Sequence, residues 1–226
     1  MAAIADNLQA VKKRIERAAV AAGRDPSTVA LLAVSKTHAA ARIEEAATAG
    51  QRAFGENYVQ EALEKIDAVP GLEWHLVGPL QSNKTRLAAE RFDWVQTVAS
   101  EKIARRLSEQ RPAGLAPLNV LIQVNASGEA SKSGIAPAAA AALASTIASL
   151  KNVRLRGLMA IPEPGAPRER YREVRDLYEK MKAAFGFDTL SMGMSDDMDL
   201  AIAEGATMVR VGTAIFGQRQ KEKSAA

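Results

Sequence analysis

The stretch Val29-Ala30-Leu31-Leu32-Ala33-Val34-Ser35-Lys36 sets the pattern from which the fold is inferred. An unbroken apolar run of this length is typical of a strand that is buried on both faces in a parallel sheet. The run closes on Lys36, whose side chain then emerges at the mouth of a sheet or barrel. A desolvated lysine amine can lose its proton and form an imine with a carbonyl. On this residue alone, a lysine that extends to water at a strand end is the better interpretation.

Apolar runs of this kind alternate with helical patterns along the chain. The strand runs fall at 29–35, 51–54, 72–77, 94–98, 118–125, 153–161, 189–194 and 207–212. The helical patterns fall near 39–49, 57–68, 82–91, 100–110, 137–149, 167–185 and 196–204. Eight strands that alternate with helices in 226 residues predict an α/β protein built as a single parallel (β/α)8 TIM barrel. A doubly wound open sheet is the alternative, but the chain has no break in composition, which favours closure.

The two ends of the chain lie outside this repeat. Ile4, Leu8 and Val11 share one helical face, so an extra amphipathic helix is expected before the first strand. No linker rich in glycine, serine or proline divides the rest, which predicts one domain over residues 1–218. The segment 219–226 is polar and is expected to form a frayed tail.

The composition excludes several classes of function. The chain has no cysteine, which removes disulfides, thiolate nucleophiles and thiolate metal sites, and we expect no metal centre. The net charge is +4, but lysine and arginine are interleaved with glutamate and aspartate, which is typical of solvated helix faces rather than of nucleic-acid binding. No run suits a membrane span or a secretory signal. We therefore predict a cytoplasmic protein that binds neither nucleic acid nor membrane.

In a (β/α)8 barrel the ligand site lies where each strand leads into its helix. The residues at these positions are largely polar or glycine: Lys36, Gly55-Glu56-Asn57, Gly78-Pro79-Leu80-Gln81, Asn125, Met159-Ala160-Ile161-Pro162, Met194-Ser195-Asp196 and Gly212-Thr213. Chance explains one or two such residues at strand ends. A whole ring of them indicates a ligand site at this end of the barrel.

Two of these strand ends suit a phosphate group. Ser195 follows the strand predicted at 189–194 and stands at an N-cap position for the next helix, while Gly212 and Thr213 close the strand at 207–212. In this fold the loops after the last two strands often bind phosphate, because helix N-termini offer unpaired N–H groups and a positive dipole end. A capped helix and a tight turn explain each motif alone. Together they favour a phosphate site.

A closed barrel makes this phosphate site a neighbour of Lys36, since the last strand pairs with the first. A ligand with a phosphate at one end and an aldehyde within reach of Lys36 fits this arrangement, and pyridoxal 5′-phosphate is the leading candidate. Arg210 lies two residues before Gly212 and therefore shares its face of the strand. Its guanidinium is placed to point at the ring nitrogen of such a ligand.

Seven stretches resemble the pyridoxal phosphate homeostasis proteins, a family with the barrel fold of the alanine racemase N-terminal domain. They follow in order over residues 5–218: AVSKT (33–37), FGENYVQE (54–61), WHLVGPLQSNK (74–84), QVNASGEASKSG (123–134), RGLMAIP (156–162), SMGMSDD (191–197) and VRVGTAIFG (209–217). The resemblance implies a barrel like that of fold type III pyridoxal phosphate enzymes, without their second domain.

The resemblance also implies which residues bind the cofactor. They are Lys36, Asn57, His75, Met159, Ser195, Arg210, Gly212 and Thr213. Lys36 would form the Schiff base, Ser195, Gly212 and Thr213 would hold the phosphate, and Arg210 would face the pyridine nitrogen. The remaining three would line the pocket.

Four residues have simpler roles that require no cofactor. Without the resemblance, Met159 is expected to pack in the core, and His75 is expected to be a histidine whose hydrogen bonds are satisfied inside the barrel. His38 is expected to be a loop residue. Lys132 is expected to be a solvated charge, although it could help to hand the cofactor over.

Arg210 bears on whether the protein is an enzyme. A guanidinium accepts no proton, so the facing ring nitrogen would stay unprotonated and the cofactor would be a weaker electron sink than beside a carboxylate. Racemases of related fold use such an arginine but add a second domain and a second acid/base. The tyrosines here are Tyr58, Tyr171 and Tyr178, and the last two lie on a charged helix. No second base is evident.

We therefore predict an intracellular protein that binds pyridoxal 5′-phosphate on Lys36 without catalytic turnover and buffers or delivers it. Apoenzymes that depend on this cofactor are its expected partners, and one barrel of this size is expected to be a monomer. The alternative is an amino-acid racemase or related enzyme acting in the barrel alone. A third, weaker hypothesis is a phosphosugar-processing barrel that uses Lys36 as aldolases do.

Overall fold

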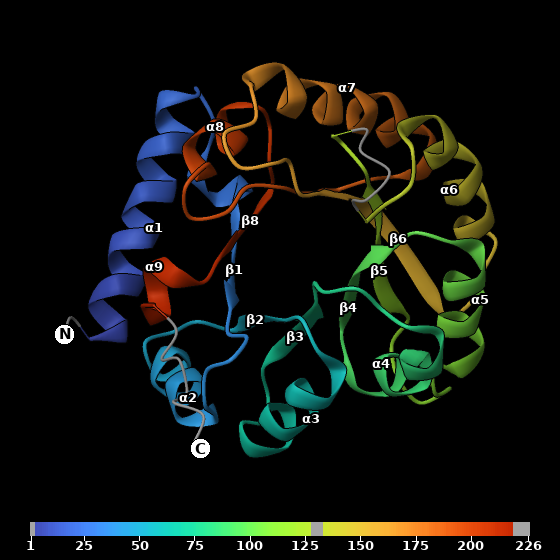
Figure 1. Ribbon diagram of the computed structural model, residues 1–226, viewed down its shortest axis with the longest axis horizontal. Helices are drawn as coiled ribbons and strands as arrows, with labels where there is room; N and C mark the ends of the chain where they lie inside the picture. The colour runs from blue at the N-terminus through green and yellow to red at the C-terminus, as the bar shows by residue number, and fades with distance from the viewer. Residues whose placement is uncertain (1–2, 128–132, 219–226) are drawn as a thin grey trace, which may run out of the picture.

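A closed barrel of parallel strands, in the order β1 to β8, forms the centre of the computed structural model, which describes residues 3–127 and 133–218 (Figure 1). The strands are β1 (Ala30–Val34), β2 (Ala53–Glu56), β3 (Glu73–Leu76), β4 (Trp94–Val98), β5 (Leu118–Val124), β6 (Val153–Ala160), β7 (Thr189–Ser191) and β8 (Met208–Val211). The prediction of a TIM barrel is confirmed.

Helices cover the outside of the barrel in a nearly continuous ring (Figure 1). They are α1 (Ile4–Ala21), α2 (Ala40–Thr48), α3 (Val59–Ala68), α4 (Thr85–Arg91), α5 (Glu101–Gln110), α6 (Ala140–Ala148), α7 (Arg168–Phe185), α8 (Met198–Ala203) and α9 (Thr213–Phe216). Short 3₁₀ turns stand at Pro26–Thr28, Ser82–Lys84 and Pro137–Ala139. In the described part of the chain, no helix is long and apolar enough to cross a membrane.

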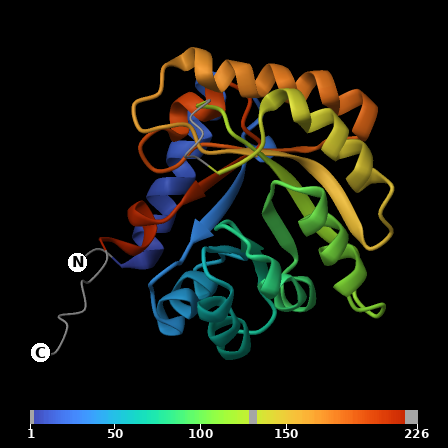
Figure 2. The ribbon, with the colours of Figure 1, turned by 45° about the vertical axis from the view of Figure 1, so that its right-hand side comes forward.

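The extra helix α1 covers the outside of the barrel where the last strand meets the first. Its apolar face is buried, with Ile4, Leu8, Val11 and Ile15 at most 5% exposed, so the predicted amphipathic helix is confirmed. The helix packs beside α8 and α9, which follow the last two strands in sequence (Figures 1 and 2). It thereby joins the start of the chain to the segments that carry the predicted phosphate site.

The pairing of β1 with β8 places Arg210 on the strand next to the one that leads to Lys36, which lies in the turn after β1. Leu32 lies opposite Arg210 and Ala33 lies opposite Val211 in a parallel register. β1 also pairs with β2, where Val34 lies opposite Gly55. The expected neighbourhood of the first and last strands is therefore present.

Two strands and one short helix depart clearly from the prediction. β2 covers Ala53–Glu56 rather than 51–54. Glu56 is fully buried and paired inside the protein, but its charge makes it look like an exposed loop residue in the sequence. β7 ends at Ser191, just before Gly193, whose φ of +92° turns the chain out of the strand. The short helix α9 was not predicted, and it follows β8 directly.

The expected N-cap is also wrong. Helix α8 begins at Met198 with Asp197 as its cap residue, and Ser195 lies in the preceding turn. The Asp197 carboxylate accepts a hydrogen bond from the backbone N–H of Met194 at 2.5 Å, so it closes this turn and delays the start of the helix. Ser195 is thereby left in the loop between β7 and α8.

Candidate functional site

A cavity of about 290 Å³ opens where the strands end and the helices begin. It is lined by Val34, Lys36, His38, Asn57, Val77, Ile161, Met194, Ser195, Asp196, Arg210, Gly212, Thr213 and Gly217. These residues come from the carboxyl ends of different strands, which is where TIM-barrel sites form. The structure thus brings together the predicted site residues Lys36, Asn57, Ser195, Arg210, Gly212 and Thr213.

Arg210 is the buried cation of this cavity. It is 4% exposed, and its guanidinium donates from Nη1 to Ser191 Oγ at 2.8 Å and from Nη2 to the carbonyl of Ala160 at 2.9 Å. Burial lowers the pKa of Arg210 to about 10, which still leaves it charged at neutral pH. The side chain therefore presents a fixed positive charge whose orientation is set from within the barrel.

The backbone on both sides of Lys36 is held by a buried ionic cluster of Lys65, Glu56 and Glu61. Lys65 is 5% exposed, and its Nζ donates to Glu56 Oε1 at 2.7 Å, to Glu61 Oε1 at 2.6 Å and to the carbonyl of Ser35 at 2.8 Å. The Ser35 hydroxyl donates to Glu56 Oε1 at 2.6 Å. Sequence reasoning missed this cluster, although a charged residue at a strand end and a lysine nine positions later gave a signal.

The residue after Lys36 has an unusual backbone. Thr37 has a φ of +67°, and no other non-glycine residue in the described ranges has a positive φ. A β-branched residue is disfavoured in this left-handed region, so surrounding contacts must hold it there. The backbone N–H of Thr37 donates to Glu61 of the same ionic cluster. The turn that carries Lys36 is therefore fixed at Ser35 and at Thr37.

The predicted phosphate side of the cavity is held from α1 and α7. Arg14 Nη1 donates to the carbonyl of Ser195 at 2.6 Å while its guanidinium pairs with Asp199. The Tyr171 hydroxyl donates to Asp197 Oδ2 at 2.5 Å, which fixes the turn from the other side. The loop after β7 is thus tied to two outer helices.

Gly212 makes the close approach of this wall possible. A Cβ atom at this position would lie 2.9 Å from the carbonyl oxygen of Val34, which is backbone and cannot swing away. Gly212 also serves as the residue before α9, whose first residue is Thr213. A side chain here would collide with the end of β1 next to the cavity.

His75 and Met159 do not line this cavity. Both are fully buried in the barrel interior. His75 stacks on Trp94 with ring centroids 5.0 Å apart, and Met159 packs with Trp94 and Leu121. The structure therefore gives both residues the core positions that their residue types suggest without the family resemblance.

His38, Met194 and Asp196 also line the cavity, although the family resemblance did not assign them to the cofactor. His38 lies in the loop between β1 and α2, and its ring stacks on Phe216 with centroids 5.1 Å apart. Met194 and Asp196 flank Ser195 in the loop before α8, and Met194 is 38% exposed. Position at a strand end was the available signal for Met194 and Asp196. Lys132 lies outside the described residues.

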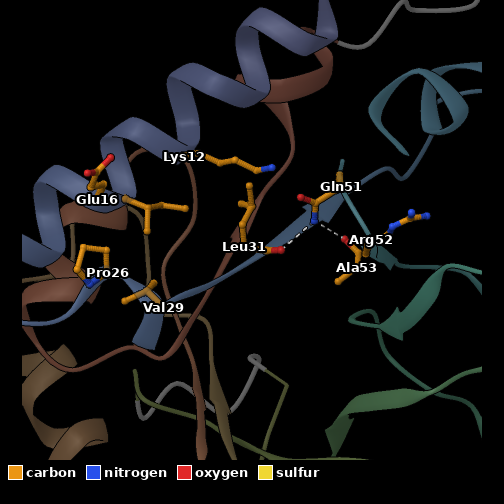
Figure 3. A pocket seen from close by; sticks show the side chains of 9 residues that line it. Lys12, Glu16, Pro26, Val29, Leu31, Gln51, Arg52 and Ala53 are labelled. Carbon is orange, nitrogen blue, oxygen red and sulfur yellow. Dashed lines mark hydrogen bonds between the residues drawn. The ribbon is translucent and has the colours of Figure 1, made fainter. Parts of the chain in front are cut away.

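A second cavity, of about 390 Å³, is larger but lacks such convergence. It lies at the opposite, N-terminal ends of β1 and β2, against α1, as Figure 3 shows. The Gln51 amide there donates hydrogen bonds to the carbonyls of Leu31 and Ala53, and Lys12 extends from α1 across the groove (Figure 3). We therefore take the cavity at the carboxyl ends of the strands as the functional site.

No group of histidine, cysteine, aspartate or glutamate side chains within 3–127 and 133–218 is arranged to hold a metal ion. The candidate site instead combines an amine, a guanidinium and hydroxyl groups. These groups bind anions and carbonyls rather than cations.

Comparisons with known proteins fit this arrangement. Residues 2–220 match the family "Alanine racemase, N-terminal domain". The chain is 59% identical over 225 residues to the pyridoxal phosphate homeostasis protein of Pseudomonas aeruginosa, with 97% of each chain covered. The chain belongs to the family of pyridoxal phosphate homeostasis proteins. The protein of the same name from Escherichia coli is 54% identical, covering 97% of this chain and 98% of its own.

Solved structures agree with this family. PipY of Synechococcus elongatus, solved with PLP bound, is 38% identical with a TM-score of 0.81, covering 95% of this chain and all of that one. Alanine racemase of Clostridium difficile is 14% identical with a TM-score of 0.74, and the match covers 96% of this chain but 58% of that one. The second likeness shows the shared barrel alone.

Proposed function

We propose that this member of the pyridoxal phosphate homeostasis proteins binds pyridoxal 5′-phosphate in the cavity at the carboxyl ends of its strands. The observation that carries the proposal is the meeting of Lys36, Arg210 and Gly212 in one cavity. The bound form of PipY and the names of the relatives support it.

The residues present fit the cofactor at each of its reactive ends. Bound pyridoxal phosphate supplies an aldehyde that condenses reversibly with a primary amine and releases water. Lys36 supplies that amine, and we propose that it holds the cofactor as a Schiff base. Ser195 and Thr213 offer hydroxyl donors for the phosphate, and Gly212 lets the backbone approach it. Asn57 lines the same cavity.

Arg210 would face the ring nitrogen. Because its guanidinium is charged and donates only, the nitrogen opposite it would accept a hydrogen bond and carry no proton of its own. His75 and Met159, buried in the barrel interior, would then act on the cofactor only through other side chains.

We propose that the protein buffers or delivers the cofactor without catalytic turnover, inside the cytoplasm, as a monomer that serves pyridoxal phosphate-dependent apoenzymes. The Tyr171 hydroxyl donates a hydrogen bond to Asp197, and Tyr178 packs against Phe187. Neither tyrosine lines the cavity, so neither supplies an acid/base there. The unprotonated ring nitrogen would further weaken carbanion chemistry.

A racemase or related enzyme acting in the barrel alone is the second candidate. The observation that favours it is His38, which lines the cavity and is a residue type that moves protons near neutral pH.

The first experiment asks whether Lys36 holds the cofactor. Wild-type protein incubated with pyridoxal phosphate should become yellow, Lys36→Ala should lose the chromophore, and Lys132→Ala should keep it. A colourless wild type would contradict binding by both candidates.

The second experiment separates a carrier from an enzyme. Loaded protein should pass its cofactor to an apoenzyme in the presence of a scavenger for free cofactor, while α-hydrogens of amino acids exchange in D₂O no faster than with free cofactor. Exchange at an enzyme's rate that disappears in His38→Asn would replace the carrier proposal with the racemase.

A further inference from the structure

An unbroken chain of hydrogen bonds crosses the barrel interior from Arg210 to the far end of the strands. Arg210 Nη1 lies 2.8 Å from Ser191 Oγ, and Ser191 Oγ lies 2.7 Å from Gln96 Oε1. Gln96 Nε2 lies 2.9 Å from His75 Nδ1, and His75 Nε2 lies 2.7 Å from Glu73 Oε1. Glu73 opens β3 at the N-terminal end of the barrel, with a side chain that is 48% exposed.

The middle of this chain is cut off from water. Ser191, Gln96 and His75 are all fully buried. Burying polar groups is unfavourable unless each finds a partner, and these side chains satisfy one another across the barrel, from β7 to β4 to β3. A side-chain network of this kind, fully satisfied, fixes one arrangement of its members.

The direction of every bond follows from its two ends. A guanidinium can only donate, so Ser191 Oγ accepts from Arg210 and gives its own hydrogen to the Gln96 carbonyl. The Gln96 amide then donates to His75 Nδ1, which must carry no hydrogen. The hydrogen of His75 is therefore on Nε2 and is donated to the Glu73 carboxylate. Every bond points away from Arg210 and toward Glu73.

The surroundings favour the neutral form of His75 that this direction requires. Burial lowers the pKa of His75, although the carboxylates of Glu73 and Asp93 act in the opposite sense. Trp94 stacks on the ring with centroids 5.0 Å apart and shields that face from water. A proton on Nδ1 would face the N–H group of the Gln96 amide, and the amide would have to rotate to present its oxygen instead.

We propose that Gln96 is a positioning residue for the cofactor site: through Ser191 it fixes the orientation of the Arg210 guanidinium, and through His75 it makes that orientation depend on a neutral imidazole at the centre of the barrel. Gln96 itself contacts no ligand and acts on the cofactor site only through Arg210. The effect on cofactor rests on the proposed function, whereas the arrangement of hydrogens does not.

The first test uses the cofactor. Gln96→Met keeps the length of the side chain but removes both polar atoms, and Ser191→Ala removes the hydroxyl. Because a hydrogen bond to a charged group is worth more than about 1.4 kcal/mol, Ser191→Ala, which removes the acceptor of Arg210, should bind pyridoxal phosphate about tenfold more weakly. Gln96→Met leaves the Ser191 hydroxyl without its own acceptor and free to rotate away from Arg210, so it should weaken binding in the same direction. The absorption maximum of the bound cofactor should also shift, which a purely structural defect would not cause. Thr189→Val is the matched control, since this buried hydroxyl on β7 donates to Asp188 and lies outside the chain.

The second test uses the protein without cofactor. The chain has two histidines, so the imidazole nitrogen signals can be assigned by comparison with His38→Asn. In the wild type near pH 7, His75 should carry hydrogen on Nε2 alone. In Gln96→Glu, whose carboxylate only accepts, Nδ1 should become protonated as well.

The outcomes separate the two proposals. If folded Gln96→Met and Ser191→Ala bind the cofactor with wild-type affinity and spectrum, the positioning role is wrong while the proposed function stands. A wild-type His75 protonated on Nδ1 would also overturn it. If the wild type binds no pyridoxal phosphate, the proposed function fails, and a bare Nδ1 that gains its hydrogen in Gln96→Glu would still support the chain.

Discussion

Lys36 and Arg210 line one cavity from neighbouring strands, yet the buried networks that support them differ in charge. Around Lys36 the network is ionic, with the ammonium of Lys65 between Glu56 and Glu61. Behind Arg210 it is a chain of neutral groups, Ser191, Gln96 and His75. The ionic network forms hydrogen bonds to the backbone on either side of Lys36, whereas the neutral chain is hydrogen-bonded to the guanidinium of Arg210 itself.

The difference matches the role proposed for each residue. An amine that forms and releases an imine must change its charge, so its side chain has to adjust while its backbone is fixed. A guanidinium that sets the electrostatics of a ring must keep both charge and direction. One barrel thus holds one residue through the backbone around it and another through the charged end of its side chain.

The largest expected effect comes from breaking the ionic network. Lys65→Met should lower the free energy of unfolding by about 3–5 kcal/mol, because it leaves two carboxylates buried or half-buried without their cation. Urea unfolding measures this loss, and Lys102→Met on the exposed face of α5 is the control. A loss below about 1 kcal/mol would mean that the cluster does not hold the Lys36 turn.

A substitution at Gly212, where β8 approaches the end of β1, should give the next largest effect. Gly212→Ala would place its Cβ against the Val34 carbonyl, so we expect a loss of about 1–3 kcal/mol in the free energy of unfolding and weaker cofactor binding. The control is Gly114→Ala, where the added atom meets nothing within 4 Å. Equal behaviour of the two variants would show that the close approach of β1 and β8 has no consequence.

The pH dependence of stability should have opposite signs in the two networks. Burial holds the pKa of His75 below its usual value, so below about pH 6.5 the unfolded chain takes up a proton that the folded one refuses, and stability falls by up to about 1.4 kcal/mol per pH unit. Burial raises the pKa of Glu56, so its folded form takes up a proton first, and its contribution to stability falls as pH rises through that raised value.

Unfolding free energies of wild type, His75→Gln and Glu56→Gln between pH 7.5 and 5 check both signs. The advantage of wild type over His75→Gln should shrink on acidification, and its advantage over Glu56→Gln should grow. His38→Gln should leave the first of these trends unchanged. Parallel curves for all variants would contradict the assignment of opposite signs.

The sequence was sufficient for the barrel and for much of the cavity wall. Apolar runs that alternate with helical patterns predicted every strand, position at a strand end led to Lys36 and Gly212, and the two-residue spacing from Gly212 led to Arg210. These signals are local, since each depends on a few consecutive residues.

The supporting networks could not be read in the same way. Ser191 and Gln96 are 95 residues apart, and nothing in either neighbourhood says that they meet across the barrel. The available signal was a glutamine inside a buried strand, as at Gln96 in β4. The shift of β2 has the same cause, because the buried charge of Glu56 looks exposed until Lys65 is known to reach it.

Borohydride reduction of the cofactor-loaded protein, followed by mass spectrometry of its peptides, tests directly whether Lys36 holds the cofactor. We predict that the pyridoxyl mass is found on the peptide that contains Lys36, and that Lys36→Ala carries none there. A label on Lys65 or Lys132 instead, or an unlabelled wild type that still binds the cofactor, would contradict the assignment of Lys36.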